Sequence, residues 1–212
     1  MLAMAYPKLL SSADILKMAI QMVERKGVDG LSLRAVASAL GVKAPSLYRY
    51  FPHKEELEVA VAEEILKVML GELQVASAIT NPDTRFRRMV DAFLRFARER
   101  FPLYSFVVQS RLAQKYDSKA GKAVWNLLIE AASAVSGQPD DTAAAVAAWS
   151  FLHGYATLEH SGAFGASGPK GGLERGVEAL LSSFRSRTKP DRKADSTRAT
   201  DVRRRKKATN RR

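Results

Sequence analysis

The sequence predicts an all-α protein, and three observations lead to this fold class. Of its 212 residues, 46% are hydrophobic, which indicates a globular chain rather than a disordered one. Apolar residues recur at helical spacing along most of the chain, whereas the β-branched alternation that strands require is nearly absent. Glycine and proline gather in a few places, where they separate the helical stretches.

The first expected helix covers residues 12–26, with Ser11 or Ser12 as its N-cap and Asp14 in its first turn. Two short helices follow in residues 32–57. The first is capped by Ser32 and ends at Gly41, and the second begins near Ala44 and Pro45 because proline is favoured in a first helical turn. This arrangement predicts a helix-turn-helix.

A longer helix is expected from Lys54 to about residue 78, and it would connect the two halves of the chain. Its predicted buried residues are Leu57, Val61, Ile65, Val68 and Leu73. After a break at residues 81–83, periodicity and caps predict the remaining helices. They cover residues 83–100, a corner at 101–104 leading into a helix to about 113, and then 118–136, 140–160 and 172–185.

The helix at residues 83–100 carries a row of arginines opposite its apolar face, namely Arg85, Arg87, Arg88, Arg95 and Arg98. Such a row is also found in nucleic-acid interfaces. However, Asp91 and Glu99 interrupt it, so we interpret it as a solvated helix face.

Composition excludes several classes of protein and locates the charge. The chain has no cysteine, which excludes disulfides and thiolate metal sites and agrees with a cytoplasmic protein. No apolar run is long enough to span a bilayer, and the first ten residues do not form a signal peptide. The net charge is +12, but residues 186–212 alone hold 12 Lys and Arg against 3 Asp, so most of it lies in a tail.

The second helix of the hairpin shows an unusual set of residues on its predicted outward face. It carries Lys43, Pro45, Ser46, Arg49 and two tyrosines, and no acid. Small side chains allow a helix to enter a major groove, and cations and hydroxyls reach phosphates. An ordinary helical hairpin with a basic face is the alternative interpretation of this spacing.

The run SLRAVASALGVKAPSLYRYFPHKEEL resembles the DNA-binding domain of the TetR family of bacterial repressors, above all in Leu47, Tyr48, Phe51 and Lys54. The resemblance implies residues that contact base edges, namely Arg34, Ala44, Pro45 and Tyr48, and residues that contact the DNA backbone, namely Ser32, Ser46, Arg49, Tyr50 and Lys54. The outward Lys43 completes this set. Alanine at position 44 differs from members with a polar residue there.

Trp149, His153 and Gly154 form a W-x-x-x-H-G pattern that resembles the signature of one group of TetR C-terminal domains. In that group the last two long helices pair with their copies in a second subunit. The resemblance therefore implies a homodimer through residues 140–160 and 172–185. The candidate interface residues are Ala148, Leu152, Gly154, Leu180 and Phe184.

Nothing in the sequence supports an enzyme, a cofactor or a metal. His153 and His160 lie seven residues apart, about 10.5 Å along a helix, which is too far for one metal ion. The glycine-rich residues 161–172 lack the spacing of a phosphate-binding loop, and no serine lies in a nucleophile motif.

The sequence therefore predicts a ligand-responsive transcriptional repressor that binds a near-palindromic operator as a homodimer. Its expected domains are a helix-turn-helix domain (1–57), a helical effector-binding and dimerisation domain (58–186) and a disordered basic tail (187–212). A small-molecule effector would lie among Phe93, Phe96, Tyr104, Phe106, Trp125, Trp149 and His153, each of which is equally explained as core. The alternative is an architectural DNA-binding protein that binds mainly through its tail.

Overall fold

The computed structural model describes residues 10–109, 117–165, 168 and 170–186. Every regular element within these ranges is a helix, so the predicted all-α class is confirmed. The predicted basic tail, residues 187–212, lies outside the described ranges. No helix in the described part of the chain is long and apolar enough to cross a membrane.

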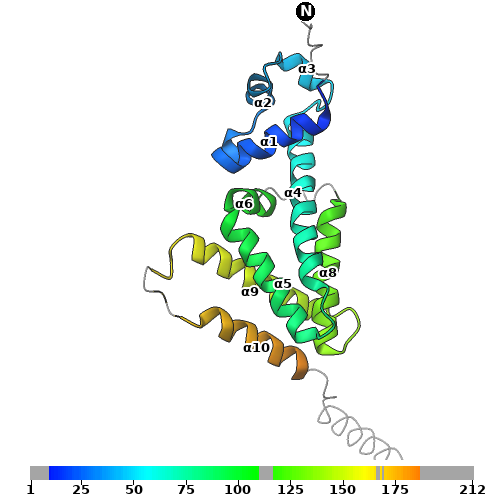
Figure 1. The fold of residues 1–212 in the computed structure, drawn as a ribbon, viewed down its shortest axis with the longest axis vertical. Helices are drawn as coiled ribbons and strands as arrows, with labels where there is room; N and C mark the ends of the chain where they lie inside the picture. The colour runs from blue at the N-terminus through cyan, green and yellow to red at the C-terminus, as the bar shows by residue number, and fades with distance from the viewer. Residues whose placement is uncertain (1–9, 110–116, 166–167, 169, 187–212) are drawn as a thin grey trace, which may run out of the picture.

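Three short α-helices form one end of the molecule (Figure 1). They are α1 (Ser12–Lys26), α2 (Leu33–Ala39) and α3 (Ala44–Tyr48), and a 3-10 turn, η1 (Val28–Gly30), joins the first two. The Oγ atoms of Ser11 and Ser32 accept the backbone N–H groups of Asp14 and Ala35, so both serines are N-caps. Gly41 adopts φ of 68°, the left-handed conformation that allows the turn between α2 and α3.

These helices enclose a small core that holds α3 in place. Its fully buried members come from all three helices and from the next one: Ile15, Ala19 and Val23, then Val36 and Ala37, then Leu47, and finally Leu57 and Val61. Leu47 is the only fully buried residue of α3, and Ala44 packs half-buried against this core. Pro45 and Tyr48 of α3 face outward.

The long helix α4 (Lys54–Ser77) continues from this end into the rest of the molecule (Figure 1). The predicted domain boundary between residues 57 and 58 falls inside this helix, so the two halves are joined by an unbroken rod. Ile65, Leu66 and Met69 are buried on its inner face. The prediction that Val68 faces inward is wrong, because its side chain is 49% exposed. Two residues correspond to about 200° of rotation, so Val68 lies opposite Leu66.

The larger half is a bundle around α4. It consists of α5 (Pro82–Glu99), α6 (Phe101–Gln109), α8 (Lys119–Ser136), α9 (Thr142–His160) and α10 (Gly172–Ser186). Both α5 and α8 pack against α4, α9 packs on α5 and α8, and α10 packs on α8 and α9. The short helix α6 contacts α4 and α5 and also reaches α1 of the other half.

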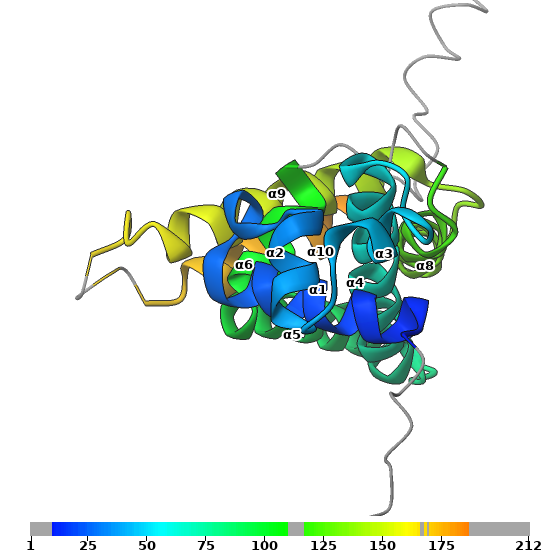
Figure 2. The ribbon, with the colours of Figure 1, turned by 90° about the horizontal axis from the view of Figure 1, so that it is seen from above.

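Side-chain caps and left-handed residues set the ends of these helices. Asn81, Ser118 and Asp141 accept the backbone N–H groups of residues three positions later, as N-caps do. Gly137 ends α8 with φ of 68°. The α9–α10 hairpin projects away from the bundle in both views (Figures 1 and 2).

The arginine row of α5 is exposed at three positions and half-buried at Arg85 and Arg87, and most of its members form ion pairs with other helices. The Arg98 guanidinium donates two hydrogen bonds to Glu159 of α9, at 2.7 and 2.9 Å. Arg85 pairs with Glu130 of α8 at 3.3 Å, and Arg87 pairs with Glu178 of α10. Exposed pairs contribute little stability, about 0–1 kcal/mol each. They fix the rotation of α5 relative to its neighbours.

Removing Phe86 tests whether the α5–α10 contact stabilises the fold. Its ring is 1% exposed and meets Phe184 edge-on, with centroids 5.7 Å apart. We expect Phe86→Ala to lower the free energy of unfolding by about 3–5 kcal/mol. The control Val75→Ala, at a side chain 79% exposed, should change it by less than about 0.5 kcal/mol. Urea unfolding at one fixed protein concentration measures both, and equal midpoints for the two variants would contradict this role.

Candidate nucleic-acid interface and internal cavity

The end of the molecule formed by α2 and α3 is positively charged and free of acids. Residues 30–54 contain no Asp or Glu, so nothing in this segment neutralises its cations. The structure exposes most of the predicted contact residues: Arg34, Lys43, Pro45, Tyr48, Arg49, Tyr50 and Lys54. Ser32, Ala44 and Ser46 are half-buried. A short helix that carries cations, tyrosine and small residues on its open side has the chemistry to approach phosphates and base edges.

Some of these residues already have partners within the chain. Ser32 uses its Oγ to cap α2, and Lys54 pairs with Glu58 at 3.2 Å. The Tyr50 hydroxyl donates to the backbone oxygen of Leu10, at 2.5 Å. This bond joins the chain just after α3 to the residues that precede α1. Tyr50 therefore has a structural role that the sequence pattern did not indicate.

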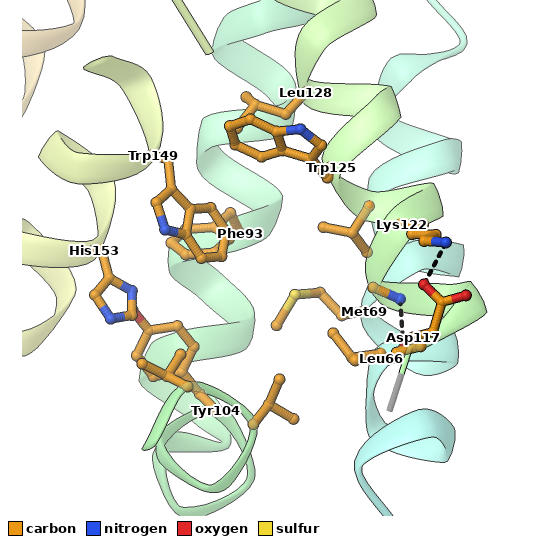
Figure 3. Close-up of a pocket in the computed structure, with 15 residues that line it drawn as sticks. Leu66, Met69, Phe93, Tyr104, Asp117, Lys122, Trp125, Leu128, Trp149 and His153 are labelled. Atoms are coloured by element: carbon orange, nitrogen blue, oxygen red, sulfur yellow. Dashed lines mark hydrogen bonds and ion pairs between the residues drawn. The ribbon is translucent and has the colours of Figure 1, made fainter. Parts of the chain in front are cut away.

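An internal cavity of about 720 Å³ lies between α4, α5, α6, α8 and α9 (Figure 3). Its volume is in the range of sites that bind drug-sized molecules. Most of its lining is apolar, and the residues come from every one of these helices: Leu66, Met69, Phe93, Tyr104, Val107, Val108, Asp117, Ser118, Gly121, Lys122, Val124, Trp125, Leu128, Trp149 and His153.

Among the residues predicted to line an effector pocket, Phe93, Tyr104, Trp125, Trp149 and His153 do line this cavity. The prediction was wrong for Phe96 and Phe106, which belong to the packed core. Phe96 lies one turn beyond Phe93, with the Arg100 guanidinium 5.4 Å from its ring centre. Phe106 is two residues from Tyr104, so the two side chains leave α6 on opposite sides.

Aromatic rings from three helices form one wall of the cavity. The ring of Phe93 meets the ring of Tyr104 edge-on, with centroids 5.7 Å apart, and it is tilted against Trp149, with centroids 6.0 Å apart. The rings of Trp149 and His153 lie nearly parallel, with centroids 5.5 Å apart. The Tyr104 hydroxyl is hydrogen-bonded to His153 Nδ1 at 2.5 Å. Burial raises the pKa of Tyr104 and lowers the pKa of His153, so both are neutral at neutral pH.

The charged residues of the cavity lie at the other end, on the side of α8. Lys122 and Asp117 form an ion pair with each other, and their side chains are 64% and 76% exposed (Figure 3). They therefore lie at the mouth of the cavity rather than inside it. Besides this ion pair, the described lining presents aromatic and aliphatic side chains, the Ser118 hydroxyl and the neutral Tyr104–His153 pair.

Sequence comparison identifies both halves of the chain. Residues 15–61 match the "Bacterial regulatory proteins, tetR family", and residues 86–184 match the "Tetracyclin repressor-like, C-terminal domain". The chain belongs to the TetR family of transcriptional regulators. Members of this family bind DNA operators, and no enzyme family is indicated. The W-x-x-x-H-G signature within the family stays a prediction.

Individual relatives agree with the family assignment. An HTH-type transcriptional regulator of Mycobacterium tuberculosis is 28% identical over 164 residues, which cover 76% of this chain and 75% of that protein. The class A tetracycline repressor of Escherichia coli is 40% identical over 57 residues, which cover 27% of this chain and 26% of that protein.

Solved structures share the fold. A protein of unknown function from Rhodococcus sp. RHA1 is 24% identical, with a TM-score of 0.67, and the match covers 86% of this chain and 98% of that one. BioQ, solved with its natural double-stranded DNA operator, is 22% identical, with a TM-score of 0.62 and coverage of 84% and 99%.

The predicted dimer residues divide into two groups in this TetR-family fold. Ala148, Leu152 and Phe184 are buried within the protomer, so their prediction as surface contacts was wrong. Their helices turn these side chains toward the bundle. Gly154 is exposed and Leu180 half-buried. The outward face of α9 contains other small or apolar residues instead: Ala143, Val146, Ala147, Ser150, Thr157 and Leu158.

Sequence reasoning missed Glu63, which connects α4 to the cavity. Its carboxylate accepts the Ser118 hydroxyl at 2.6 Å and the Ala120 backbone N–H at 3.0 Å, so it binds the start of α8. Ser118 itself lines the cavity. The two partners lie more than fifty residues from Glu63 along the chain, and an acid on a long helix gives no local signal of such a contact.

The depressed pKa of His153 predicts a pH-dependent stability. Below the ordinary histidine pKa of about 6.5, the unfolded chain takes up a proton that the folded chain rejects. Acidification through that value should therefore lower the free energy of unfolding. Urea unfolding at several pH values between about 7.5 and 5.5 measures this slope. His153→Gln should flatten the slope, because it removes the buried imidazole whose pKa is lowered. The same slope in His153→Gln as in the unmodified protein would contradict the assignment.

Proposed function

We propose that this TetR-family regulator is a ligand-responsive repressor that binds a near-palindromic operator as a homodimer. The observation that carries the proposal is the course of α4. The same helix contributes Leu57 and Val61 to the core behind the acid-free surface, and Leu66 and Met69 to the cavity. A DNA-binding surface and a ligand site therefore share one rigid element. A regulator that meets chromosomal DNA in this way acts in the bacterial cytoplasm.

DNA recognition is assigned to α2, α3 and the turn between them. The family resemblance assigns contacts with base edges to Arg34, Ala44, Pro45 and Tyr48. Of these, Arg34 and Tyr48 have the exposed side chains that such contacts require. Arginine binds the two acceptors of guanine at once, whereas alanine offers only an apolar contact. Arg34 is thus the residue that reads a guanine.

Contacts to the phosphates are assigned to the residues around this surface: Ser32, Lys43, Ser46, Arg49, Tyr50 and Lys54. Because Tyr50 donates its proton to Leu10, it is left with an acceptor oxygen, and its contribution to phosphate binding is the smallest of the set. Lys43, Arg49 and Lys54 provide the positive charge that makes binding salt-dependent.

The contact with a second copy of the chain is assigned to the outward face of α9, with α10 beside it. Gly154 supports this, because a Cβ added there would meet no atom within 4 Å. On the same face of α9, Val146 and Leu158 are each 48% exposed. A helix of a second copy would approach closely at Gly154 and cover both side chains. Two-fold symmetry then implies half-sites about 34–36 Å apart, or a multiple of that distance.

Ligand response is assigned to α4 and α6, which line the cavity and also contact the DNA-binding end. Glu63 fixes the start of α8 to α4, and α6 packs on α1. A ligand that moves α6 or α8 therefore changes the angle between the two halves. Release requires the ligand to bind the DNA-free form more tightly, by about 1–3 kcal/mol in typical couplings.

Arg34 and Lys54 test the DNA assignment because they should fail in different ways. Arg34→Ala should weaken the operator by about 1–3 kcal/mol and relax preference at one base pair. Lys54→Ala should weaken binding to operator and random DNA alike. It should also reduce the slope of log affinity against log salt concentration by ~0.9, the value for one phosphate contact. Operator fragments come from a genomic footprint, and a titration at several salt concentrations gives both quantities. If Arg34→Ala loses the same affinity for operator and for random DNA, Arg34 does not read a guanine.

The dimer assignment is tested with two exposed helical glycines that carry the same substitution. Gly154→Leu should raise the dimer dissociation constant at least tenfold, about 1.4 kcal/mol, because leucine would hold the two α9 helices apart. Gly71→Leu is the matched control: its added Cβ also meets nothing within 4 Å, but it lies on α4, outside the proposed interface. Sedimentation velocity over a concentration series measures both, and an unchanged profile for Gly154→Leu would place the interface elsewhere.

A further inference from the structure

The aromatic content of the cavity points to a particular kind of ligand. The sequence has two tryptophans, and both line this cavity, Trp125 from α8 and Trp149 from α9. Phe93, Tyr104 and His153 add three more rings (Figure 3). Ring pairs in edge-on or offset contact gain about 0.5–1.5 kcal/mol beyond the area they bury. A planar aromatic ligand would gain this contact energy from the aromatic wall and from Trp125, whereas a saturated ligand would gain from burial alone.

Charge in the cavity restricts the ligand further. Among the described residues that line the cavity, the charged ones are Asp117 and Lys122, which pair with each other at the mouth. Burying a ligand's carboxylate or ammonium beside the rings would remove it from water without a counter-charge, and unpaired buried charges are costly. Burial lowers the pKa of His153, so desolvation opposes the imidazolium that would have to pair with a buried anion. The interior therefore favours an uncharged molecule.

A polar position lies on the aromatic wall where Tyr104 meets His153. The other uncharged polar side chains of the described lining are the two tryptophans, through their indole N–H groups, and Ser118, which binds Glu63. If the tyrosine donates to Nδ1, its oxygen still has lone pairs that accept a hydrogen bond. A ligand hydroxyl placed against the ring wall would join this pair. Such a bond would orient the ligand without requiring any charge.

We propose that the cavity binds an uncharged, planar aromatic molecule whose single hydrogen-bonding group joins the Tyr104–His153 pair. This inference rests on the proposed ligand response and specifies its ligand class. It separates aromatic effectors from fatty acids and from organic cations. The ion pair at the mouth stays intact when such a ligand is bound.

A set of probes with one carbon skeleton tests each part of the proposal. Equilibrium dialysis against the full chain compares 2-naphthol with naphthalene, 2-naphthoate, 2-naphthylmethylammonium and decahydro-2-naphthol. We expect 2-naphthol to bind most tightly, with naphthoate and the ammonium each weaker by at least tenfold, about 1.4 kcal/mol. The saturated decahydro-2-naphthol should also bind more weakly than 2-naphthol.

Variants locate the polar contact. His153→Phe keeps a ring in place and should remove the preference for 2-naphthol over naphthalene, and Tyr104→Phe should reduce that preference. His160→Phe makes the same substitution outside the cavity and should leave the preference unchanged. Circular dichroism of each variant checks that it is folded. If His153→Phe is unfolded, the result for Tyr104→Phe alone decides whether the pair forms the polar contact.

Several results would overturn the inference: a charged probe that binds as tightly as 2-naphthol, a saturated probe that equals it, an unchanged preference in both variants, or no binding by any probe. Release of operator DNA is measured separately. Probes that bind in the expected order without releasing DNA would support the ligand class and contradict the ligand response. Release of operator DNA by another compound, with no binding of these probes, would support the ligand response and contradict the ligand class.

Discussion

The rest of the structure depends on the unbroken course of α4. Its 24 residues span about 36 Å, and its inner face is buried at both ends. Leu57 and Val61 belong to the core that holds α3, while Leu66 and Met69 form part of the cavity wall. A sharp kink in a helix packed in this way would break backbone hydrogen bonds and open both cores. In the proposed ligand response, a displacement of α4 at the cavity therefore becomes a change of angle at α3.

A second constraint lies in the two faces of α9. Trp149 and His153 line the cavity, while Val146, Ser150 and Gly154 lie on the open side. The inward side is filled by alanines such as Ala145 and Ala148, which let α9 pack closely on its neighbours. One helix thus forms the wall of the cavity and, in the proposed dimer, the contact with a second copy. A ligand that shifts Trp149 acts on both.

Much of this architecture could be predicted from local sequence, because local chemistry determines it. Capping serines and glycines with positive φ fix the helix ends at Ser32, Gly41 and Gly137, and each has a short-range signature. Periodicity also shows that Phe93 and Phe96 face inward. It does not show which inward space stays unfilled, because that depends on how five helices meet. For the same reason, Glu63 could not be assigned, since its partners on α8 become neighbours only in the folded chain.

In the proposed ligand response, the cavity itself limits how strongly a ligand acts on DNA binding. Apolar walls without partner atoms forfeit dispersion contacts, so the empty bundle gives up stability that a filled one would have. A ligand regains part of this packing energy, but only the part that differs between the DNA-bound and DNA-free angles of α4 shifts the equilibrium. In the proposed ligand response, contacts to Leu66 and Met69 act on α4 directly, whereas contacts to Trp125 reach α4 through α8 and Glu63. A ligand's affinity then depends on every wall of the cavity, and its effect on DNA binding depends on the walls that move α4.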